Sequence, residues 1–390
     1  MRYLFVIVAA TFVVLIHFYV YRRLIRDTTR QVVIRRAGAA LSVALVILFV
    51  IARVLQSQPS PRPWAMPLFS ASWLWLGLAT YLAFFFGATD GVRWVAKRFS
   101  QLRRSADRVD AISEERRLFL SRAAAGGAIA LTGGLGGFGL WRAYEPPKVT
   151  EIAVRLPNLP KALEGFSIVQ LSDLHISSII RPHFLDDVVR RCNALKPDLL
   201  AITGDLVDGS VPALGALVAQ LTGIRSRSGS FFVTGNHDYY SGDRQWCDAL
   251  RKMGFHVLRN ERTSIGDASA SFDLVGVDDW GHRDRQRRPG YDLNRALIGR
   301  DPSRAAVLLA HQPANFEESA DRGMGLQLSG HTHGGQFFPV TTIASLRWPH
   351  SAGLYTHGEG KLYVSRGTGF WGPPLRAGSP SEIVKITLLS

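Results

Sequence analysis

The sequence predicts an α/β domain that follows an α-helical membrane region. The first part of the chain holds long apolar runs separated by Arg-rich loops. The remainder holds short apolar runs, rich in β-formers, that end in Asp, Asn or His. The segments that separate the first few of these apolar runs follow helical periodicity. Strands and helices therefore alternate along the second part, as they do in α/β domains.

Four apolar runs are each long enough to cross a bilayer as a helix, at about residues 3–21, 37–54, 64–86 and 118–141. Trp and Tyr residues in the third run are of the kind that settles at membrane interfaces. We therefore expect a membrane region over residues 1–145 and a separate domain over residues 149–390.

Arginine clusters set the expected orientation of the membrane region. The loops at 22–36 and 87–117 are rich in arginine, whereas the loop at 55–63 is not. Under the positive-inside rule the two Arg-rich loops are cytoplasmic. The protein is then a multi-pass protein of the cytoplasmic membrane, with the lipid bilayer as a partner. The fourth segment runs outward and carries the second domain to the extracytoplasmic side.

The fourth segment begins with Arg116–Leu120 (RRLFL), which resembles a twin-arginine export signal. The usual pattern has Ser before the arginine pair, where this chain has Glu115, and Lys where it has Ser121. The motif also lies inside the chain. An ordinary Arg-flanked membrane helix explains the same residues and gives the same topology. A Gly-rich linker would instead leave the second domain in the cytoplasm. The one interior charge, Arg122 near the cytoplasmic edge, favours a membrane helix.

The positive charge of the chain belongs to the membrane region. The formal net charge is +15. Residues 1–148 hold 20 Lys and Arg against 7 Asp and Glu, whereas the remainder holds 26 against 24. Because the second domain is nearly neutral, we expect no nucleic-acid partner. Two cysteines, Cys192 and Cys247, make neither a disulfide framework nor a thiolate cluster, and we expect buried thiols rather than one bridge.

The second domain opens with an alternating strand at 149–156. Helical periodicity at 184–195 and 213–221 separates the strands that carry the first polar motifs. Asp173 and Asp205 are 32 residues apart and Asn236 follows 31 residues later, a spacing typical of βαβ units. Further strands are predicted at 272–277, 306–310, 326–329, 362–365 and 383–389. Since α/β sheets place their chemistry at the carboxyl ends of strands, the polar residues there should converge.

Seven side chains after these strands offer nitrogen or oxygen donors to a metal: Asp173, His175, Asp205, Asn236, His311, His331 and His333. A carboxylate such as Asp205 can bridge two cations with its two oxygens. The remaining six donors then divide into two sets of terminal ligands. Imidazole and carboxylate without thiolate favour Mn, Fe or Zn over Ca or Mg. Two such cations about 3.5–4 Å apart can generate hydroxide and neutralise a phosphoryl group.

Three further residues are assigned supporting roles. His237, next to Asn236, is placed to protonate a leaving oxygen. Asp208 and Asp238 are candidates for fixing imidazole tautomers from outside the ligand set.

In chain order, the motifs Asp-x-His, Gly-Asp-x-x-Asp, Gly-Asn-His-Asp, an isolated His and Gly-His-x-His resemble the calcineurin-like metallophosphoesterases, in particular a bacterial membrane-attached or exported branch. The resemblance covers residues 150–390. It implies a four-layer αββα sandwich, two divalent metal ions and hydrolysis of phosphate esters. It also implies two ligand sets that share Asp205: one adds Asp173, His175 and His333, and the other adds Asn236, His311 and His331. His237 would be the acid.

The expected activity is cleavage of a phosphodiester or phosphomonoester by a membrane-anchored hydrolase, with a lipid or envelope polymer as a candidate substrate. One alternative is a pyrophosphatase of a UDP-linked acyl sugar in lipid A synthesis. That substrate is cytoplasmic, which disagrees with the expected topology. Another alternative is a non-catalytic membrane sensor. A sensor is expected to lack a ligand or the acid, and none is missing.

A Gly- and Pro-rich loop near the C-terminus holds the last candidates. Arg366 and Arg376 border it and could bind a substrate phosphate, or could equally lie in solvent or in ion pairs. Phe370 and Trp371 in the same loop could contact an acyl chain or a membrane, with core packing as the alternative.

Overall fold

The computed structural model describes residues 2–56, 63–103, 113–177, 179–180, 182–279 and 290–390. These residues form two compact units. The first contains the N-terminal helices as far as Leu140, together with Pro373–Leu375. The second contains the rest of the chain from Trp141 onward. The domain limits at residues 145 and 149 stay predictions.

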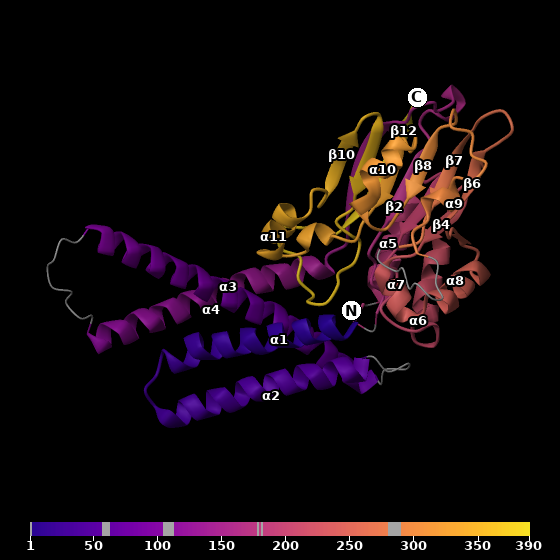
Figure 1. The fold of residues 1–390 in the computed structure, drawn as a ribbon. Coiled ribbons are helices and arrows are strands. Elements are labelled where there is room, and N and C mark those ends of the chain that lie inside the picture. Colours follow the sequence, from indigo (N-terminus) through magenta and orange to yellow (C-terminus); the bar gives the residue numbers. More distant parts are fainter. Residues whose placement is uncertain (1, 57–62, 104–112, 178, 181, 280–289) are drawn as a thin grey trace. The chain divides into compact units, whose positions relative to one another are not determined.

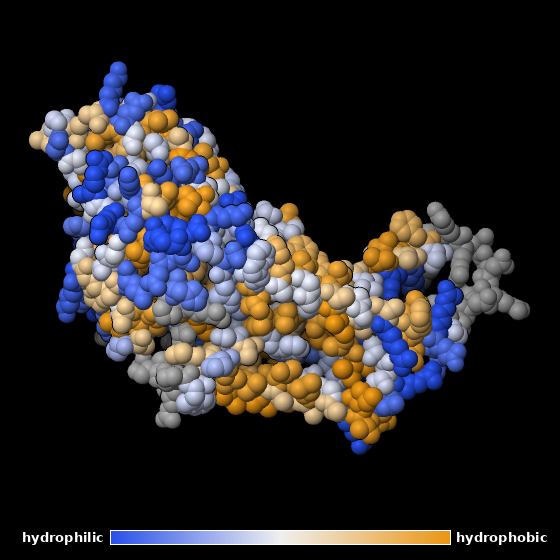
Figure 2. All heavy atoms as spheres, turned by 180° about the vertical axis from the view of Figure 1, so that it is seen from behind, coloured by the Kyte–Doolittle hydropathy of each residue, from blue (hydrophilic) through white to orange (hydrophobic). Residues whose placement is uncertain are grey.

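Long apolar helices make up the first unit (Figure 1). They are α1 (Arg2–Tyr21), a π-helical continuation η1 (Arg22–Arg26), α2 (Val32–Gln56), η2 (Pro63–Ala65), α3 (Met66–Arg103) and α4 (Glu114–Tyr144). By length and composition, three stretches of the described residues could cross a membrane: Val32–Gln56, Met66–Ser100 and Glu114–Tyr144. Figure 2 shows hydrophobic side chains over much of the surface of these helices. The prediction of apolar helices that could span a membrane is confirmed.

Polar contacts connect α1 and η1 with α3. Asp90 on α3 accepts hydrogen bonds from the Tyr19 hydroxyl at 2.6 Å and from Nε of Arg23 at 2.9 Å. Trp75 on α3 donates to Nε2 of the buried His17 on α1 at 2.9 Å. A polar group in apolar surroundings is costly without a partner, so these contacts fix how the helices pack.

α3 is longer than the predicted segment 64–86, because it continues through residues that we expected to form a polar linker. The continuation to Arg103 contains no proline, and its Arg, Lys and Ala residues favour helix. Gly87 and Gly91 each weaken a helix by about 1 kcal/mol relative to alanine, which is too little to end it. The apolar and polar parts are therefore one helix.

Two six-stranded sheets form the centre of the second unit. The first has the order β1-β12-β2-β3-β4-β5. In this order the strands span Lys148–Arg155, Glu382–Leu389, Ser167–Leu171, Leu199–Thr203, Ser230–Val233 and His256–Val257. β2, β3, β4 and β5 are parallel, and β12 runs antiparallel to β2. The carboxyl ends of β2, β3 and β4 therefore lie at one edge.

The second sheet has the order β10-β11-β9-β8-β7-β6. Its strands span Gly353–His357, Gly360–Val364, Leu326–Ser329, Ala306–Leu309, Ser271–Gly276 and Glu261–Gly266. β7, β8, β9 and β11 are parallel, and the edge strands β6 and β10 are antiparallel to their neighbours.

The remaining helices are short. The α-helices are α5 (Pro182–Ala194), α6 (Val211–Val218), α7 (Asn236–Ser241), α8 (Asp243–Lys252), α9 (Leu293–Ala296), α10 (Phe316–Asp321) and α11 (Val340–Arg347). The 3-10 segments are η3 (Lys161–Leu163), η4 (Ala219–Gly223), η5 (Pro313–Asn315) and η6 (His333–Gly335).

Buried side chains arrange these elements in four layers. One core contains Leu185 of α5 and Leu250 of α8 and joins these helices to the first sheet. A second core lies between the sheets and contains Ile168 of β2 and Leu328 of β9. Leu293 of α9 packs in a third cluster, on the outer side of the second sheet. The predicted αββα sandwich is confirmed.

The sequence analysis does not predict β5, β6 and β10. β6 is an edge strand with the polar sequence ERTSIG, and one of its residues, Ile265, is buried. β10 is also an edge strand and has no buried residue. Alternating hydrophobicity arises from one buried face, so edge strands of this kind give little signal.

Candidate metal centre

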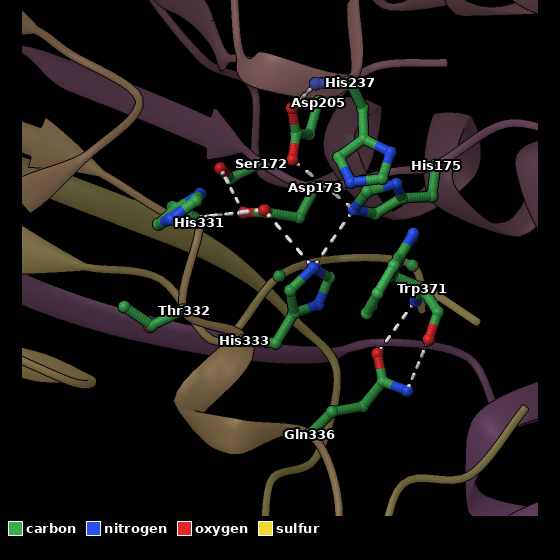
Figure 3. A network of polar contacts seen from close by, with 12 residues as sticks. Ser172, Asp173, His175, Asp205, His237, His331, Thr332, His333, Gln336 and Trp371 are labelled. Carbon is green, nitrogen blue, oxygen red and sulfur yellow. Dashed lines mark hydrogen bonds and ion pairs between the residues drawn. The ribbon is translucent and has the colours of Figure 1, made fainter. Parts of the chain in front are cut away.

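Parallel strands of both sheets carry the predicted donor residues at their carboxyl ends. β2, β3 and β4 of the first sheet lead into Asp173, Asp205 and Asn236. β8 and β9 of the second sheet lead into His311 and the turn 331–333. Figure 3 shows labelled side chains from these turns pointing toward one another. The fold thus brings the predicted donors together at one place.

Tight turns after the strands aim these side chains inward. Five of the donors have left-handed backbone, with positive φ: Asp173 (52°), His175 (45°), Asp205 (49°), His331 (72°) and His333 (51°). This conformation costs about 1–2 kcal/mol for a residue with a Cβ atom. Backbone hydrogen bonds hold it, since the amides of Asp173 and His175 donate to carbonyls of the 204–205 loop at 3.0 Å. Such strain is concentrated at functional sites.

Asp173, His175 and His333 form the first group of possible ligands, and all three are buried. Nε2 of His333 lies 3.1 Å from Nε2 of His175 and 3.4 Å from Oδ1 of Asp173. One ligand atom from each residue lies within 4.8 Å of the others. A single cation with bonds of about 2.0–2.2 Å could reach all three.

Asp205, His311 and His331 form the second group. Nε2 of His311 lies 3.2 Å from Oδ2 of Asp205 and 3.2 Å from Nδ1 of His331. The same Oδ2 lies 3.7 Å from Nε2 of His175, which belongs to the first group. The Asp205 carboxylate therefore lies between the two groups.

Hydrogen bonds fix the tautomers of two of these imidazoles. Nδ1 of His311 lies 2.9 Å from the carbonyl oxygen of Thr203, which can only accept, so Nδ1 carries the proton. Nδ1 of His175 lies 3.0 Å from Oδ2 of Asp208 and donates to it in the same way. Both rings therefore direct Nε2 into the site, and this nitrogen can bind a metal ion when it carries no proton.

Asn236 supplies the strongest sign that the residues suit a cation. Its Oδ1 is buried and makes no hydrogen bond within the described part of the chain. Its side chain is hydrogen-bonded to that of Tyr240, four residues further along. An unpaired buried carbonyl oxygen costs about 1–3 kcal/mol. A divalent cation at this point would satisfy that oxygen, so the residues fit a metal site.

The charges of the site are coupled. Burial by itself would raise the pKa of Asp205, but His311, His237 and His175 hold it well below its ordinary value. Burial would lower the pKa of His311, but the Asp205 carboxylate raises it well above 6.5. These shifts show that the pocket around Asp205 favours positive charge next to the carboxylate, which is what a divalent cation supplies.

His333 is in the opposite situation. Burial, followed by the neighbouring His175 and the Arg376 guanidinium, lowers the pKa of His333 well below its ordinary value. The ring is therefore neutral near pH 7. Metal ions bind neutral imidazole, so His333 needs to release no proton when a cation binds.

His237 and Asp208 form a pair beside the ligands. Nδ1 of His237 lies 2.6 Å from Oδ1 of Asp208. Burial would lower the pKa of His237, but Asp208 raises it to about 9. His237 is thus protonated near neutral pH. Asp208 uses its other oxygen for His175, so one carboxylate orients both imidazoles.

Asp238 acts through the backbone. Its Oδ1 accepts hydrogen bonds from the amides of Leu206 at 3.0 Å and Val207 at 3.3 Å, and its Oδ2 accepts from Gly235 at 2.8 Å. These bonds connect the loop after β3 with the loop after β4. Asp238 therefore orders two ligand loops, whereas its predicted contact with an imidazole stays a prediction.

Arg366 and Arg376 lie in different environments. Arg366 is partly exposed, and its Nη1 lies 3.7 Å from Oε2 of Glu382. Arg376 is buried, and its Nη1 donates to the carbonyls of Arg366 at 2.7 Å and Ser379 at 3.2 Å. Its Nη2 lies 3.2 Å from Nδ1 of His333. Arg376 therefore holds the C-terminal loop against a candidate ligand; substrate binding by either arginine stays a prediction.

The sequence analysis does not identify Tyr240 and Gln336 as parts of the site. Tyr240 follows Asn236 by four residues in α7 and therefore lies on the same helix face. Gln336 follows His333 by three residues and forms two hydrogen bonds with the backbone of Trp371, which Figure 3 shows. The helical spacing could have suggested Tyr240, but the partner of Gln336 is 35 residues away.

The chain is similar to a set of known proteins. Residues 166–335 match the family model described as calcineurin-like phosphoesterase. A Danio rerio protein named "Transmembrane protein with metallophosphoesterase domain" is 36% identical over 322 residues, which cover 80% of this chain and 72% of that protein. A Campylobacter jejuni uncharacterized metallophosphoesterase is 38% identical over 248 residues, covering 63% of this chain and 64% of that protein.

An Aquifex aeolicus protein, also an uncharacterized metallophosphoesterase, is 36% identical over 243 residues. The match covers 62% of this chain and 91% of that protein. The shared part is thus close to the whole of this shorter relative.

Proposed function

Because the chain belongs to the calcineurin-like phosphoesterase family and is a hydrolase, we propose that it is a membrane-anchored enzyme that cleaves phosphate esters with two divalent cations. The observation that carries the proposal is the position of Asp205. Its Oδ2 lies 3.2 Å from Nε2 of His311 and 3.7 Å from Nε2 of His175, so one carboxylate faces both groups of donors.

The proposed ligand sets are those that the family resemblance implies, and this geometry supports them. Asp173, His175, Asp205 and His333 would hold one cation. Asp205, Asn236, His311 and His331 would hold the other. Two divalent cations in these positions would supply an activated water and neutralise the charge that develops on the phosphoryl group. The donor set favours Mn, Fe or Zn.

His237 is the proposed acid. Its Nδ1 donates to Asp208, which leaves Nε2 to face a bound ester. With its pKa raised to about 9, His237 holds a proton at Nε2 near neutral pH and can pass it to the leaving oxygen. Asp208 then stabilises the orientation of the ring throughout the reaction.

We propose that the enzyme lies in the cytoplasmic membrane and that its second unit, Trp141–Gly372 with Arg376–Ser390, is on the extracytoplasmic side. We call this second unit the hydrolase unit. The Arg-rich loops and the apolar helices support this orientation. The substrate is then an ester that is accessible there, such as one on a lipid or an envelope polymer.

The test uses the full chain in detergent, stripped with chelator and reloaded with Mn, Zn or Fe. Hydrolysis of a chromogenic phosphodiester is compared with that of the matching monoester. Metal-dependent turnover is expected, with two equivalents of metal bound. Asp205→Asn is expected to lose one or both equivalents and nearly all turnover, because it removes the bridging carboxylate.

Two controls keep the test specific. Asp248→Asn changes a carboxylate that is 70% exposed and pairs with Arg251. It has no assigned role in the site, so turnover and metal content should stay unchanged. If the wild-type chain binds two equivalents but hydrolyses neither ester with any of the metals, general phosphoesterase activity is ruled out. A non-catalytic sensor would then be favoured.

A further inference from the structure

Two aromatic rings contact the proposed acid. The ring centroid of His237 lies 5.3 Å from that of Tyr240 and 5.5 Å from that of Trp371. Both aromatic residues are accessible to solvent, with 69% of Tyr240 and 43% of Trp371 exposed. Figure 3 shows the Trp371 side chain beside the cluster of imidazoles. The polar centre therefore has a hydrophobic rim next to His237.

The backbone of each aromatic residue is connected to a segment that carries a candidate metal ligand. Oε1 of Gln336 accepts from the backbone amide of Trp371 at 2.8 Å, and Nε2 of Gln336 donates to its carbonyl at 2.9 Å. Gln336 is buried and directly follows η6, which contains His333. Tyr240 lies in α7, which begins with Asn236. The position of each ring is thus fixed relative to a candidate ligand.

The two rings lie where the leaving group of a bound substrate would be. His237 is the proposed proton donor to the leaving oxygen, so the group attached to that oxygen must lie close to the His237 ring. Rings centred 5.3 Å and 5.5 Å from this imidazole are within contact range of that group. The phosphate itself is bound by charged groups and gains little from aromatic neighbours.

Resting on the proposed function, we propose that Tyr240 and Trp371 form a subsite for an apolar leaving group. The natural substrate is then an ester between phosphate and an alcohol with a hydrocarbon or aromatic body. Burying exposed aromatic surface against such a body is favourable by the hydrophobic effect, and aromatic side chains contribute large areas. A small hydrophilic alcohol would leave both rings in water.

The test compares phosphate esters that differ in the leaving alcohol alone. The metal-loaded full chain is assayed on esters of ethanol, octanol and 2-phenylethanol, which are similar in acidity, so leaving ability is matched. Release of each alcohol gives kcat/KM. The octyl and phenylethyl esters are expected to exceed the ethyl ester by about tenfold or more, the scale of a few buried methylenes. The octyl and phenylethyl arms distinguish a lipid-like from an aromatic alcohol.

Variants of the rim then locate the preference. Trp371→Ser and Tyr240→Ser are each expected to reduce the ratio of apolar ester to ethyl ester by about threefold to tenfold, as loss of one ring contact predicts. A ratio is used because Tyr240 also contacts Asn236, and a general loss of kcat cancels. Trp348→Ser is the matched control: Trp348 is 42% exposed, against 43% for Trp371, and should leave the ratio unchanged.

The outcomes separate the two proposals. Equal kcat/KM for the three esters, or unchanged ratios in both rim variants, overturns the subsite and leaves phosphate-ester hydrolysis standing. If no ester is hydrolysed, the proposed function fails, and the subsite is tested by calorimetric binding of ethylphosphonate and octylphosphonate. Tighter binding of octylphosphonate that is lost in Trp371→Ser supports the subsite, and equal affinities overturn it.

Discussion

Asp208 is the residue that connects a candidate metal ligand with the proposed acid. Its two oxygens accept from Nδ1 of His175 at 3.0 Å and from Nδ1 of His237 at 2.6 Å. Burial would raise the pKa of Asp208, but these two imidazoles hold it well below its ordinary value. The carboxylate is therefore charged near neutral pH, and its two hydrogen bonds orient both rings with Nε2 toward the site.

We predict that Asp208→Asn reduces kcat by about 10–100-fold, the usual effect of removing a group that orients a metal ligand. The amide cannot accept two N–H donors with equal strength, so His237 and His175 lose their fixed orientation. Steady-state kinetics and metal analysis by mass spectrometry measure the two effects. A variant with wild-type kcat and two bound equivalents would show that Asp208 is dispensable.

The two cysteines are buried thiols that take no part in the candidate site. Cys192 and Cys247 are free and buried, which confirms the expectation of buried thiols. Burial raises the pKa of each thiol to about 12. At pH 8 both are protonated and shielded in the folded chain, whereas unfolded thiols with a pKa of about 8.5 are partly ionised.

We predict that neither cysteine is alkylated at pH 8 until the hydrolase unit unfolds, since alkylation needs an accessible thiolate. Above pH 8.5 the unfolded chain loses thiol protons that the folded chain keeps, so unfolding becomes more favourable as pH rises toward 12. Rates of iodoacetamide labelling with and without denaturant check the first point. Replacing both cysteines with alanine should flatten the second dependence between pH 8 and 10. Rapid labelling of the native chain would contradict the burial.

At the scale of elements, strand ends and the turns after them build the site. Gly235 precedes α7, and a Cβ atom there would collide with Oδ1 and the backbone nitrogen of Asp205. Gly215 lies inside α6, and a Cβ atom there would meet Cγ1 of Val211 at 3.7 Å, an ordinary contact. The same substitution therefore has opposite expected effects in these two elements.

We predict that Gly235→Ala abolishes metal binding and activity, because the loop after β4 must move away from Asp205. Gly215→Ala should stabilise the hydrolase unit by up to about 1 kcal/mol through the higher helix propensity of alanine. Metal content, turnover and thermal unfolding of the two variants form one matched experiment. Full activity in Gly235→Ala would mean that the contact between the two loops is not needed.

The two sheets are also joined through the site, since Asp205 follows a strand of the first sheet and His311 a strand of the second. We predict that chelation lowers the melting temperature of the hydrolase unit. A cation at 100 times its Kd stabilises the folded state by about 2.7 kcal/mol. That corresponds to roughly 5–10 °C for a unit of this size. Scanning calorimetry with EDTA, then with added Mn or Zn, should show a reversible shift, and His331→Asn should reduce it. Identical melting with and without chelator would exclude a structural contribution of the metal.

At the scale of the whole molecule, the apolar helices and the hydrolase unit divide the chain into parts with different solvents. The polar contacts of Asp90 with Tyr19 and Arg23 lie among helices whose surfaces carry exposed apolar side chains. That composition suits a bilayer, whereas the surface of the hydrolase unit carries many hydrophilic residues (Figure 2).

We predict that alkaline phosphatase, a reporter that is active outside the cytoplasm, is active when fused after Ser390 and inactive when fused after Arg103. The reason is the arginine content of residues 87–117, which should remain in the cytoplasm. Changing Arg116 and Arg117 together to Lys should silence the Ser390 fusion if the twin-arginine route is used. An inactive fusion at Ser390 in the unchanged chain would place the hydrolase unit in the cytoplasm.

Much of the fold follows from local sequence. Buried strands such as β3 and β8, each a largely apolar run followed by a polar motif, are identifiable because every residue in them is buried. The polar continuation of α3 and the edge strands β6 and β10 are not, because helix propensity and pairing at an edge leave no hydrophobic period. In the site, the order and spacing of the donor motifs suggest the seven candidate ligands, the proposed acid His237, and Asp208.

The sequence by itself determined the family, the hydrolase class and the residue types of the metal centre, because metal chemistry requires particular side chains at the ends of strands. Only the tertiary structure decided which partners each of these residues contacts. It placed Asp205 between the two groups, gave Asp208 two imidazole partners, turned Asp238 to the backbone and buried Arg376 under its own loop. It also brought Trp371 to His237. Each of these contacts joins residues through space rather than along a strand or helix, so no local periodicity records it.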